Sequence, residues 1–418
     1  MVTRTPGTRS ELARPPLAAL LPTLLVVAGS VAWRRGDVFS GGVDPVVAAK
    51  ALVSLAALVL AWRLDCSGRP GRRVGTGTLW VLAVLLVASV LGAAEHGTLV
   101  AGAVVAVRVA IMAVTVRLLL RAVGATALLT AVVWACGIVG GVAALTGLAT
   151  WTGGRLFGGL PPLNPNEIAL LAGVVVIGAA WPTLLGRGRP RHAVVFLVAA
   201  GVLWLTGSRT SLLVVLLAVG VGALRLRRPQ VGLVAGAGLA VTAGALLIAS
   251  TSAVSSFVDR TDASGNSTLG SRFIAWEAAL DWADSTWQWA FGAGLSVKLI
   301  PVAGQWWNEQ LLDSSWVSAF VQAGVVGVLA AAAWVVAAAR GLRHLEAAAW
   351  PAAAGLLFFV CGRSLLESGL LDATPALLVL LTVSFAGERG TRGLPVADPP
   401  PAAGSPAPAD PVLVGSRG

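Results

Sequence analysis

An arginine among small hydroxyl residues marks the first candidate site in the chain. The stretch LWLTGSRTSLLVV, residues 203–215, places Arg209 beside Ser208, Thr210 and Ser211 and between two apolar runs. A guanidinium group binds phosphate or carboxylate through paired hydrogen bonds, so this pattern favours an anion site. An arginine that snorkels to the membrane surface is the alternative interpretation.

A second arginine lies in a predicted amphipathic helix. The stretch SRFIAWEAALDWADSTWQWA, residues 271–290, spaces its apolar side chains by three and four residues, which predicts a helix that lies on a membrane or caps a bundle. Ser271 is the expected N-cap, so Arg272 opens the helix. A cation there opposes the helix dipole unless an anion is bound. We therefore expect Arg272 to be an anion ligand.

A carboxylate follows near the end of the same polar stretch. Asp313 stands in QWWNEQLLDSSW, residues 305–316, directly before an apolar run. Two roles fit this residue. It either caps the next helix or accepts the proton of a hydroxyl nucleophile as a general base, and the two roles are compatible.

Other polar residues flank or interrupt the apolar runs. Asn166 either caps the helix that follows it or contacts a substrate. Arg363 and Glu367 are four residues apart, which predicts an ion pair on one helix face. Arg108 lies inside an apolar run, where ionisable residues are candidates for function. The remaining candidates are Arg155, Ser208 and Arg260 for substrate contact and Trp276 for stacking on a sugar or joining an interfacial belt.

Membrane-spanning helices must position these residues. Hydrophobic residues make up 56% of the 418-residue chain and charged residues only 12%, which predicts an all-α, polytopic membrane bundle. The net charge of +11 comes from short basic clusters between apolar runs, so nucleic-acid binding is not expected. The 3 cysteines and 3 histidines lack metal-site spacing, and no cofactor or metal is expected.

Apolar runs predict about twelve transmembrane helices. Lys and Arg are concentrated on one side of these helices if both termini are cytoplasmic. The long segment 251–314 then lies outside, as does the turn at Arg209, which is expected to be recessed between two short helices. Residues 1–387 form the predicted transmembrane domain and 388–418 a disordered cytoplasmic tail. The predicted spans are 16–33, 45–62, 77–94, 98–119, 123–146, 167–185, 192–207, 210–225, 231–250, 315–339, 347–366 and 370–387.

Several of these stretches, in this order, resemble the bacterial O-antigen ligase and polysaccharide polymerase superfamily of membrane glycosyltransferases. The resemblance covers roughly residues 150–387. The stretches that carry it are PLNPNEIA (162–169), LTGSRTSLL (205–213), GSRFIAWEAAL (270–280), FGAGLS (291–296), DSSWVSAFVQAGVVG (313–327) and GRSLLESGL (362–370).

The resemblance implies a GT-C-like bundle with a long outer loop, containing the amphipathic helix, between the ninth and tenth spans. It implies inverting, metal-independent transfer of a glycan from an undecaprenyl-pyrophosphate-linked oligosaccharide to a hydroxyl of a glycan or other acceptor. The reaction would occur at the outer face of the bacterial cytoplasmic membrane, among membrane lipids. Arg209 and Arg272 would engage the pyrophosphate, and Asp313 would serve as base.

Two distinctions stay open at this point. Ligases of this superfamily commonly carry a histidine near the end of the long loop, where this chain has Asp313, Ser314 and Ser315, so polymerase and ligase are both retained. A twelve-helix transporter or flippase of lipid-linked sugars is the main alternative from another class, and a non-enzymatic membrane scaffold is a third.

Overall fold

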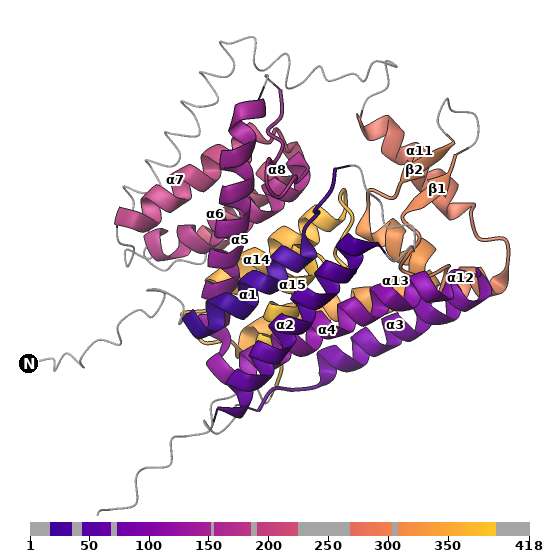
Figure 1. Ribbon diagram of the computed structural model, residues 1–418, viewed down its shortest axis with the longest axis horizontal. Helices are drawn as coiled ribbons and strands as arrows, with labels where there is room; N and C mark the ends of the chain where they lie inside the picture. Colours follow the sequence, from indigo (N-terminus) through magenta and orange to yellow (C-terminus); the bar gives the residue numbers. More distant parts are fainter. Residues whose placement is uncertain are drawn as a thin grey trace, which may run out of the picture.

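The computed structural model is mostly helical, with its helices packed into one bundle (Figure 1). Within the part of the chain that the structure describes, six helices are long and apolar enough to cross a membrane, as expected of a membrane protein. They are α2 (Pro45–Cys66), α3 (Gly77–Glu95), α4 (Leu99–Val123), α5 (Ala125–Gly147), α6 (Pro165–Leu184) and α13 (Ser315–Gly341). The structure describes residues 17–35, 44–67, 73–151, 154–184, 190–224, 268–302 and 308–389.

Shorter apolar helices complete the bundle. They are α1 (Leu17–Ser30), α7 (Pro190–Leu205), α8 (Arg209–Leu224), α14 (Trp350–Ser364) and α15 (Pro375–Gly387). Each predicted span in the described part of the chain coincides with a helix, and the span at 231–250 lies outside it. The last span starts five residues later than predicted, because Gly369 turns the chain with a φ of 107° and Thr374 caps α15.

The helix α15 forms the centre of the packing. All of its side chains are buried, as expected for a helix that is apolar on every face. It contacts α4, α5, α13 and α14. The hydroxyl of Ser384 accepts a hydrogen bond of 2.7 Å from the indole of Trp334, so this buried polar pair is satisfied.

The long helix α13 is broken at Gly324, where φ is 63° and ψ is −164°. Only glycine adopts this conformation without strain, and a Cβ here would meet the backbone of Ala290 at 2.2 Å. The break frees two carbonyl groups, which accept hydrogen bonds from the N–H groups of Ala293 (2.8 Å) and Gly294 (3.0 Å). The end of α12 (Thr286–Phe291) therefore locks onto the break.

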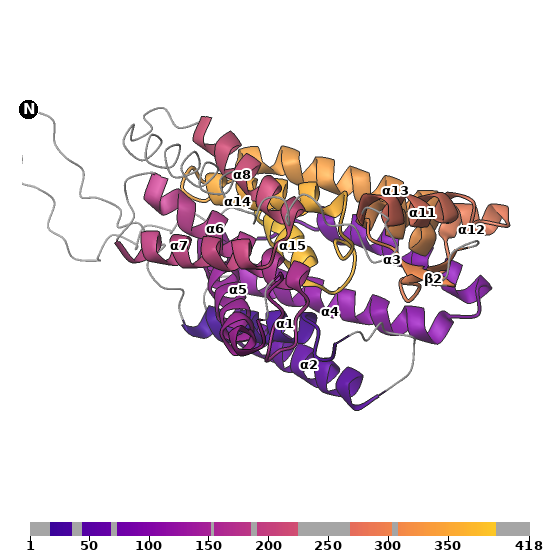
Figure 2. The ribbon, with the colours of Figure 1, turned by 90° about the horizontal axis from the view of Figure 1, so that it is seen from above.

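A small cap covers one end of α13 (Figures 1 and 2). It consists of α11 (Thr268–Leu280), α12 and an antiparallel hairpin of β1 (Leu299–Pro301) and β2 (Glu309–Leu311). The hairpin departs from the all-α prediction, although it is only three residues per strand. Apolar side chains of α11, the hairpin and α13 form a separate small core: Ala275, Ala279, Ile300, Leu312 and Val321.

The predicted helix 271–290 is wrong in two respects. It is two helices, because the chain leaves α11 after Leu280 and Ser285 starts α12 by accepting a hydrogen bond from the N–H of Gln288. The first helix also begins at Thr268, so Ser271 lies inside it and is not its N-cap. Arg272 therefore does not open the helix, and the dipole argument for an anion at this residue no longer holds.

The predicted tail begins with a residue that contacts the bundle. The carboxylate of Glu388 accepts hydrogen bonds from the N–H groups of Gly77 (3.2 Å) and Thr78 (2.6 Å) at the start of α3. A negative group at a helix N-terminus is favourable, so Glu388 caps α3. Residues 390–418 of the predicted tail lie outside the described residues.

Candidate functional site

Most of the predicted site residues meet around one carboxylate, that of Glu367. We call this group the Glu367 cluster. Its members come from the segment before α6, from the starts of α6, α8 and α13, from α11 and from the end of α14, so one end of the bundle assembles it. The members are Arg155, Asn166, Ser211, Arg272, Asp313, Arg363 and Glu367.

Three side chains reach the carboxylate of Glu367. The amide of Asn166 donates to both oxygens at 3.0 Å, and Nη2 of Arg272 donates to Oε1 at 3.2 Å. Nη2 of Arg363 lies 3.7 Å from Oε2. The backbone is held as well, because the hydroxyl of Ser315 donates to the carbonyl of Glu367 at 2.8 Å. The carboxylate is thus fixed between two cations and an amide.

Arg363 is the most deeply buried cation of the cluster, with 5% of its surface exposed. Its Nη2 donates to the carbonyl of Asn166 at 2.8 Å, and its Nε donates to the hydroxyl of Ser211 at 3.2 Å. The predicted ion pair with Glu367 is confirmed. The prediction of a shared helix face is wrong, because α14 ends at Ser364 and Glu367 lies in the turn beyond it.

Asn166 faces the cluster, and its neighbour caps the helix. Asn164 precedes Pro165, the first residue of α6, and its side chain accepts a hydrogen bond of 2.8 Å from the N–H of Glu167. The carboxylate of Glu167 in turn accepts a hydrogen bond of 3.1 Å from the N–H of Asn164, which completes a capping box. Capping as the role of Asn166 is therefore wrong, since its amide is directed to Arg155 and Glu367.

Arg155 is delivered by a segment that folds back over the ends of α5 and α7. The N–H of Leu156 donates to the carbonyl of Leu205, which holds this segment on α7. Nε of Arg155 donates to the carbonyl of Thr206 at 3.0 Å, and Nη2 donates to Oδ1 of Asn166 at 2.6 Å. The third guanidinium group of the cluster is thereby joined to Glu367 through the Asn166 amide.

Asp313 pairs with Arg272 at the exposed edge of the cluster. Its Oδ2 lies 3.5 Å from Nε of Arg272. Ser314, and not Asp313, caps α13, because its hydroxyl accepts from the N–H of Trp316. Burial raises the pKa of the Asp313 carboxyl, Glu367 raises it further, and Arg272 lowers it in part. A carboxylate with a raised pKa is a better proton acceptor than an ordinary aspartate.

Three guanidinium groups (Arg155, Arg272 and Arg363) share the cluster with two carboxylates (Asp313 and Glu367), and Glu167 lies within electrostatic range of Arg363. The recess between Arg363, Glu367 and Ser315 is too narrow for a water molecule. The side chains of Arg272 and Asp313 are 17% and 34% exposed, so the cluster is accessible from outside at this edge. The arrangement is suited to an anion beside a proton acceptor.

Arg209 is two residues from Ser211, a member of the cluster, but its own side chain lies at the surface. Its neighbours Ser208 and Ser211 are buried and joined by a hydroxyl–hydroxyl bond of 3.0 Å, and Ser211 accepts from Arg363. Arg209 itself is the first residue of α8 and is exposed. Its exposure does not measure its depth in a membrane, so the predicted recessed position of the turn stays a prediction.

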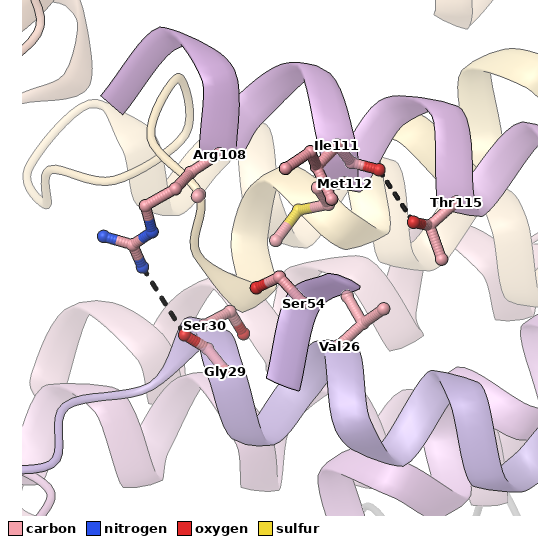
Figure 3. A pocket seen from close by; sticks show the side chains of 9 residues that line it. Val26, Gly29, Ser30, Ser54, Arg108, Ile111, Met112 and Thr115 are labelled. Atoms are coloured by element: carbon pink, nitrogen blue, oxygen red, sulfur yellow. Dashed lines mark hydrogen bonds between the residues drawn. The ribbon is translucent and has the colours of Figure 1, made fainter. Parts of the chain in front are cut away.

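Arg108 belongs to a different place in the bundle. Figure 3 shows its guanidinium group directed toward the end of α1, where Nη2 donates to the carbonyl of Gly29 at 3.4 Å. Its Nε is buried and has no hydrogen-bond partner among the described residues. The cavity here, lined by Ser30 and Ser54 among others, is about 10 Å³, roughly the space of one water molecule. The structure does not bring Arg108 to the Glu367 cluster.

An ion pair between Lys298 and Asp372 was not predicted from the sequence. The ammonium group of Lys298 donates to both carboxylate oxygens of Asp372 at 2.5 Å, which ties the start of the hairpin to the turn before α15. Asp372 also lies within electrostatic range of Arg108. Lys298 and Asp372 are 74 residues apart in the sequence, and pairing at that range depends on the fold, so the sequence gives no signal for this ion pair.

Trp276, the aromatic candidate, does not join the cluster. The ring of Trp276 packs edge-on against Phe273 at 5.4 Å, and its N–H is buried without a hydrogen-bond partner in the described part of the chain. Trp316, which was not a candidate, donates to the hydroxyl of Ser364 at 3.1 Å beside the cluster. Arg260 lies outside the described residues.

Metal-ligating residues do not gather in the described part of the chain, where no three His, Cys, Asp or Glu side chains are close enough to hold an ion. No protein-family model matches the chain, and no curated protein matches its sequence. The geometry of the Glu367 cluster is therefore the main evidence that bears on the function of the protein.

Proposed function

We propose that the protein is a membrane glycosyltransferase that transfers or polymerises glycans from an undecaprenyl-pyrophosphate-linked donor onto an acceptor hydroxyl. One observation supports this proposal above the others. It is the Glu367 cluster, in which three arginines and a carboxylate of raised pKa, that of Asp313, lie together at one end of an apolar bundle. The resemblance in sequence order described above points to the same reaction.

The arginines fit the leaving group of such a reaction. When the glycosidic bond to the carrier breaks, the bonding electron pair stays on the pyrophosphate, which gains negative charge. Preorganised guanidinium groups stabilise that charge strongly where water is scarce. Arg272 is the direct ligand in this proposal, because it is partly exposed at the edge of the cluster. Arg209, exposed beside Ser208, reaches the same donor from the membrane side.

Asp313 fits the role of general base. The acceptor oxygen forms a bond to the anomeric carbon as the bond to the pyrophosphate oxygen breaks, and the hydroxyl proton passes to the Asp313 carboxylate. Attack from the face opposite the leaving group inverts the anomeric centre. In this scheme the Asp313 carboxylate contacts the acceptor hydroxyl on one face of the anomeric carbon, while the guanidinium group of Arg272, paired with it at 3.5 Å, extends to the pyrophosphate on the other.

Glu367 fits a positioning role in this scheme. It holds Arg272 on one side and the Asn166 amide on the other, and through that amide it orients Arg155. A side chain that fixes phosphate ligands before the donor arrives lowers the cost of ordering them in the transition state. We assign Asn166, Arg155 and Arg363 to the same task, since each contacts Glu367 or one of its partners.

The fold that accompanies this function is a GT-C-like bundle of about twelve transmembrane helices in the bacterial cytoplasmic membrane. Both termini are cytoplasmic in the proposal, and the Glu367 cluster faces outward. The basic stretch at residues 186–191 then lies at the cytoplasmic face. The starts of α6 and α8 and the end of α14 share the outer side, which agrees with their meeting in the cluster.

Reconstitution with a labelled lipid-linked oligosaccharide tests the proposal. The wild-type protein should transfer the glycan to acceptor or lengthen it, and Arg272→Ala should lower the rate by about 10²–10³-fold. Asp313→Asn should lower it by about 10²–10⁴-fold. Arg63→Ala removes an exposed arginine in the last turn of α2 and should leave the rate unchanged. Wild-type rates in both site variants at normal membrane levels would refute the assignment.

The break in α13 bears on the alternative function, that of a transporter or flippase of lipid-linked sugars. Broken helices such as α13 occur in transporters, where the freed carbonyl groups bind the coupling ion. In this protein the freed carbonyl groups are those of Val321 and Gln322, and they already accept hydrogen bonds from the N–H groups of Ala293 and Gly294. The break is therefore explained by packing and gives no support to an ion site there. In the reconstitution, a transporter would move the labelled donor unchanged, and a scaffold would neither move nor alter it.

A further inference from the structure

An apolar groove is lined by residues of α5, α6 and α7, with Ala352 and Leu356 of α14. The helices α5, α6 and α7 lie on the side of the bundle away from α11 and α12 (Figures 1 and 2). The volume of the groove is about 380 Å³, and apolar atoms form almost all of its surface. Small residues hollow it out, among them Gly137 and Gly141 of α5 and Ala179 of α6. Ile138 and Val198 stand exposed at its rims, so the groove is open along the outside of the bundle.

The groove has a direction, because α5 and α6 run antiparallel. A Cβ at Gly178 would meet Val133, near the start of α5, whereas a Cβ at Gly140 would meet Leu171, near the start of α6. The groove therefore extends from the beginning of α5 and the end of α6 toward the middle of both helices. The Glu367 cluster, which includes Asn166 at the beginning of α6, lies beyond the opposite end.

Basic residues line the first of these ends. Arg191 and His192, in the first turn of α7, contribute to the wall together with Pro182 of α6. Nε of Arg191 is buried and has no hydrogen-bond partner among the described residues. A buried guanidinium N–H without a partner is costly, and an anionic oxygen removes that cost. The groove thus combines an apolar trough with a cation that lacks a complete set of acceptors.

The length of the trough matches one leaflet of a bilayer. From Leu129 to Gly141, both of which line it, α5 rises about 18 Å at 1.5 Å per residue, against about 15 Å for half of the hydrocarbon core. We propose that the groove binds one acyl chain of an anionic glycerophospholipid, with the lipid phosphate on Arg191. In the orientation of the proposed function this lipid belongs to the cytoplasmic leaflet, on the far side from the donor.

Two glycines offer a matched pair of variants. Cβ atoms added at Gly141 and Gly201 would each meet nothing within 4 Å, so a larger side chain can start at either position without a clash at its first atom. Gly141 lines the groove, while Gly201 is exposed on α7 and does not line it. Gly141→Leu therefore fills the trough, and Gly201→Leu adds the same side chain elsewhere on the apolar surface. Arg191→Gln removes the charge at the end of the groove.

Native mass spectrometry of the delipidated full-length protein tests the proposal. Phosphatidylglycerol and phosphatidylcholine with the same acyl chains serve as probes. The wild-type protein and Gly201→Leu should retain phosphatidylglycerol in preference to phosphatidylcholine. Gly141→Leu should lose this adduct, and Arg191→Gln should bind phosphatidylglycerol about tenfold more weakly, as loss of one charge-assisted contact implies.

Three results would overturn the proposal. One is equal retention of phosphatidylglycerol by Gly141→Leu and Gly201→Leu. Another is equal retention of the two lipids by the wild-type protein. The third is a stronger adduct with a polyprenyl phosphate than with phosphatidylglycerol, which would assign the groove to the carrier lipid. Binding is measured without donor or acceptor, so absence of glycan transfer would refute the proposed function and leave this inference standing.

Discussion

Replacing Glu367 by alanine tests the central contact of the site in a way that does not depend on the reaction. The substitution removes the carboxylate that accepts from Asn166 and Arg272 and pairs with Arg363. Only 12% of the Glu367 side chain and 7% of the Arg363 side chain are exposed, so solvent replaces little of what is lost. Removing one member of a buried ion pair costs about 3–5 kcal/mol, because the other charge stays buried.

Glu367→Ala should therefore lower the free energy of unfolding by about 3–5 kcal/mol. Glu367→Gln keeps an oxygen for Asn166 and Arg272 but removes the charge, and it should cost about 1–3 kcal/mol. Glu277→Ala is the matched control, since Glu277 is an exposed glutamate on α11, and it should cost less than about 0.5 kcal/mol. The free energies are measured by denaturant titration of the purified protein in mixed micelles, followed by tryptophan fluorescence.

The reasoning fails if Glu367→Ala unfolds at the same denaturant concentration as Glu277→Ala. It also fails if Glu367→Gln is more damaging than Glu367→Ala, because the amide keeps more of the contacts. A large loss in the alanine variant with a smaller loss in the glutamine variant would show that charge pairing and hydrogen bonding both hold the cluster together.

The other predictions concern the base, the helix break and the helix cap. Transfer should decline on acidification through the raised pKa of Asp313, so the acid limb of the pH–rate profile should lie above about pH 3.9, the pKa of an ordinary aspartate. Glu367→Gln removes a charge that raises this pKa and should move the limb to lower pH; an unmoved limb would exclude Asp313 as the base. Gly324→Ala should cost about 1–3 kcal/mol of unfolding free energy from backbone strain alone, and an unchanged denaturant midpoint would contradict the close approach of α12. Asn164→Ala should cost about 1 kcal/mol of stability and leave the transfer rate nearly unchanged, whereas Asn166→Ala should reduce the rate; equal effects on rate would contradict their separate roles.

Some local features followed from the sequence because neighbouring residues decide them. Runs of apolar residues place the helices, since a long apolar segment is stable only when buried in a core or a membrane. The pairing of Arg363 with Glu367 also followed from their spacing of four residues, although the helix ends before the second of them. The break between α11 and α12 did not follow, because apolar spacing continues across the polar residues that interrupt the helix.

The sequence by itself determined that this chain builds apolar helices and that its polar residues sit near their ends, because both depend on the local order of residue types. It did not determine which of two nearby asparagines would cap α6, or that Glu367 would be the common partner of the site. Those outcomes depend on contacts between Glu367 and residues 95 and 201 positions away, Arg272 and Asn166. Only the packing of α6, α11 and α14 brings such distant groups within hydrogen-bonding distance, and local sequence order carries no record of it.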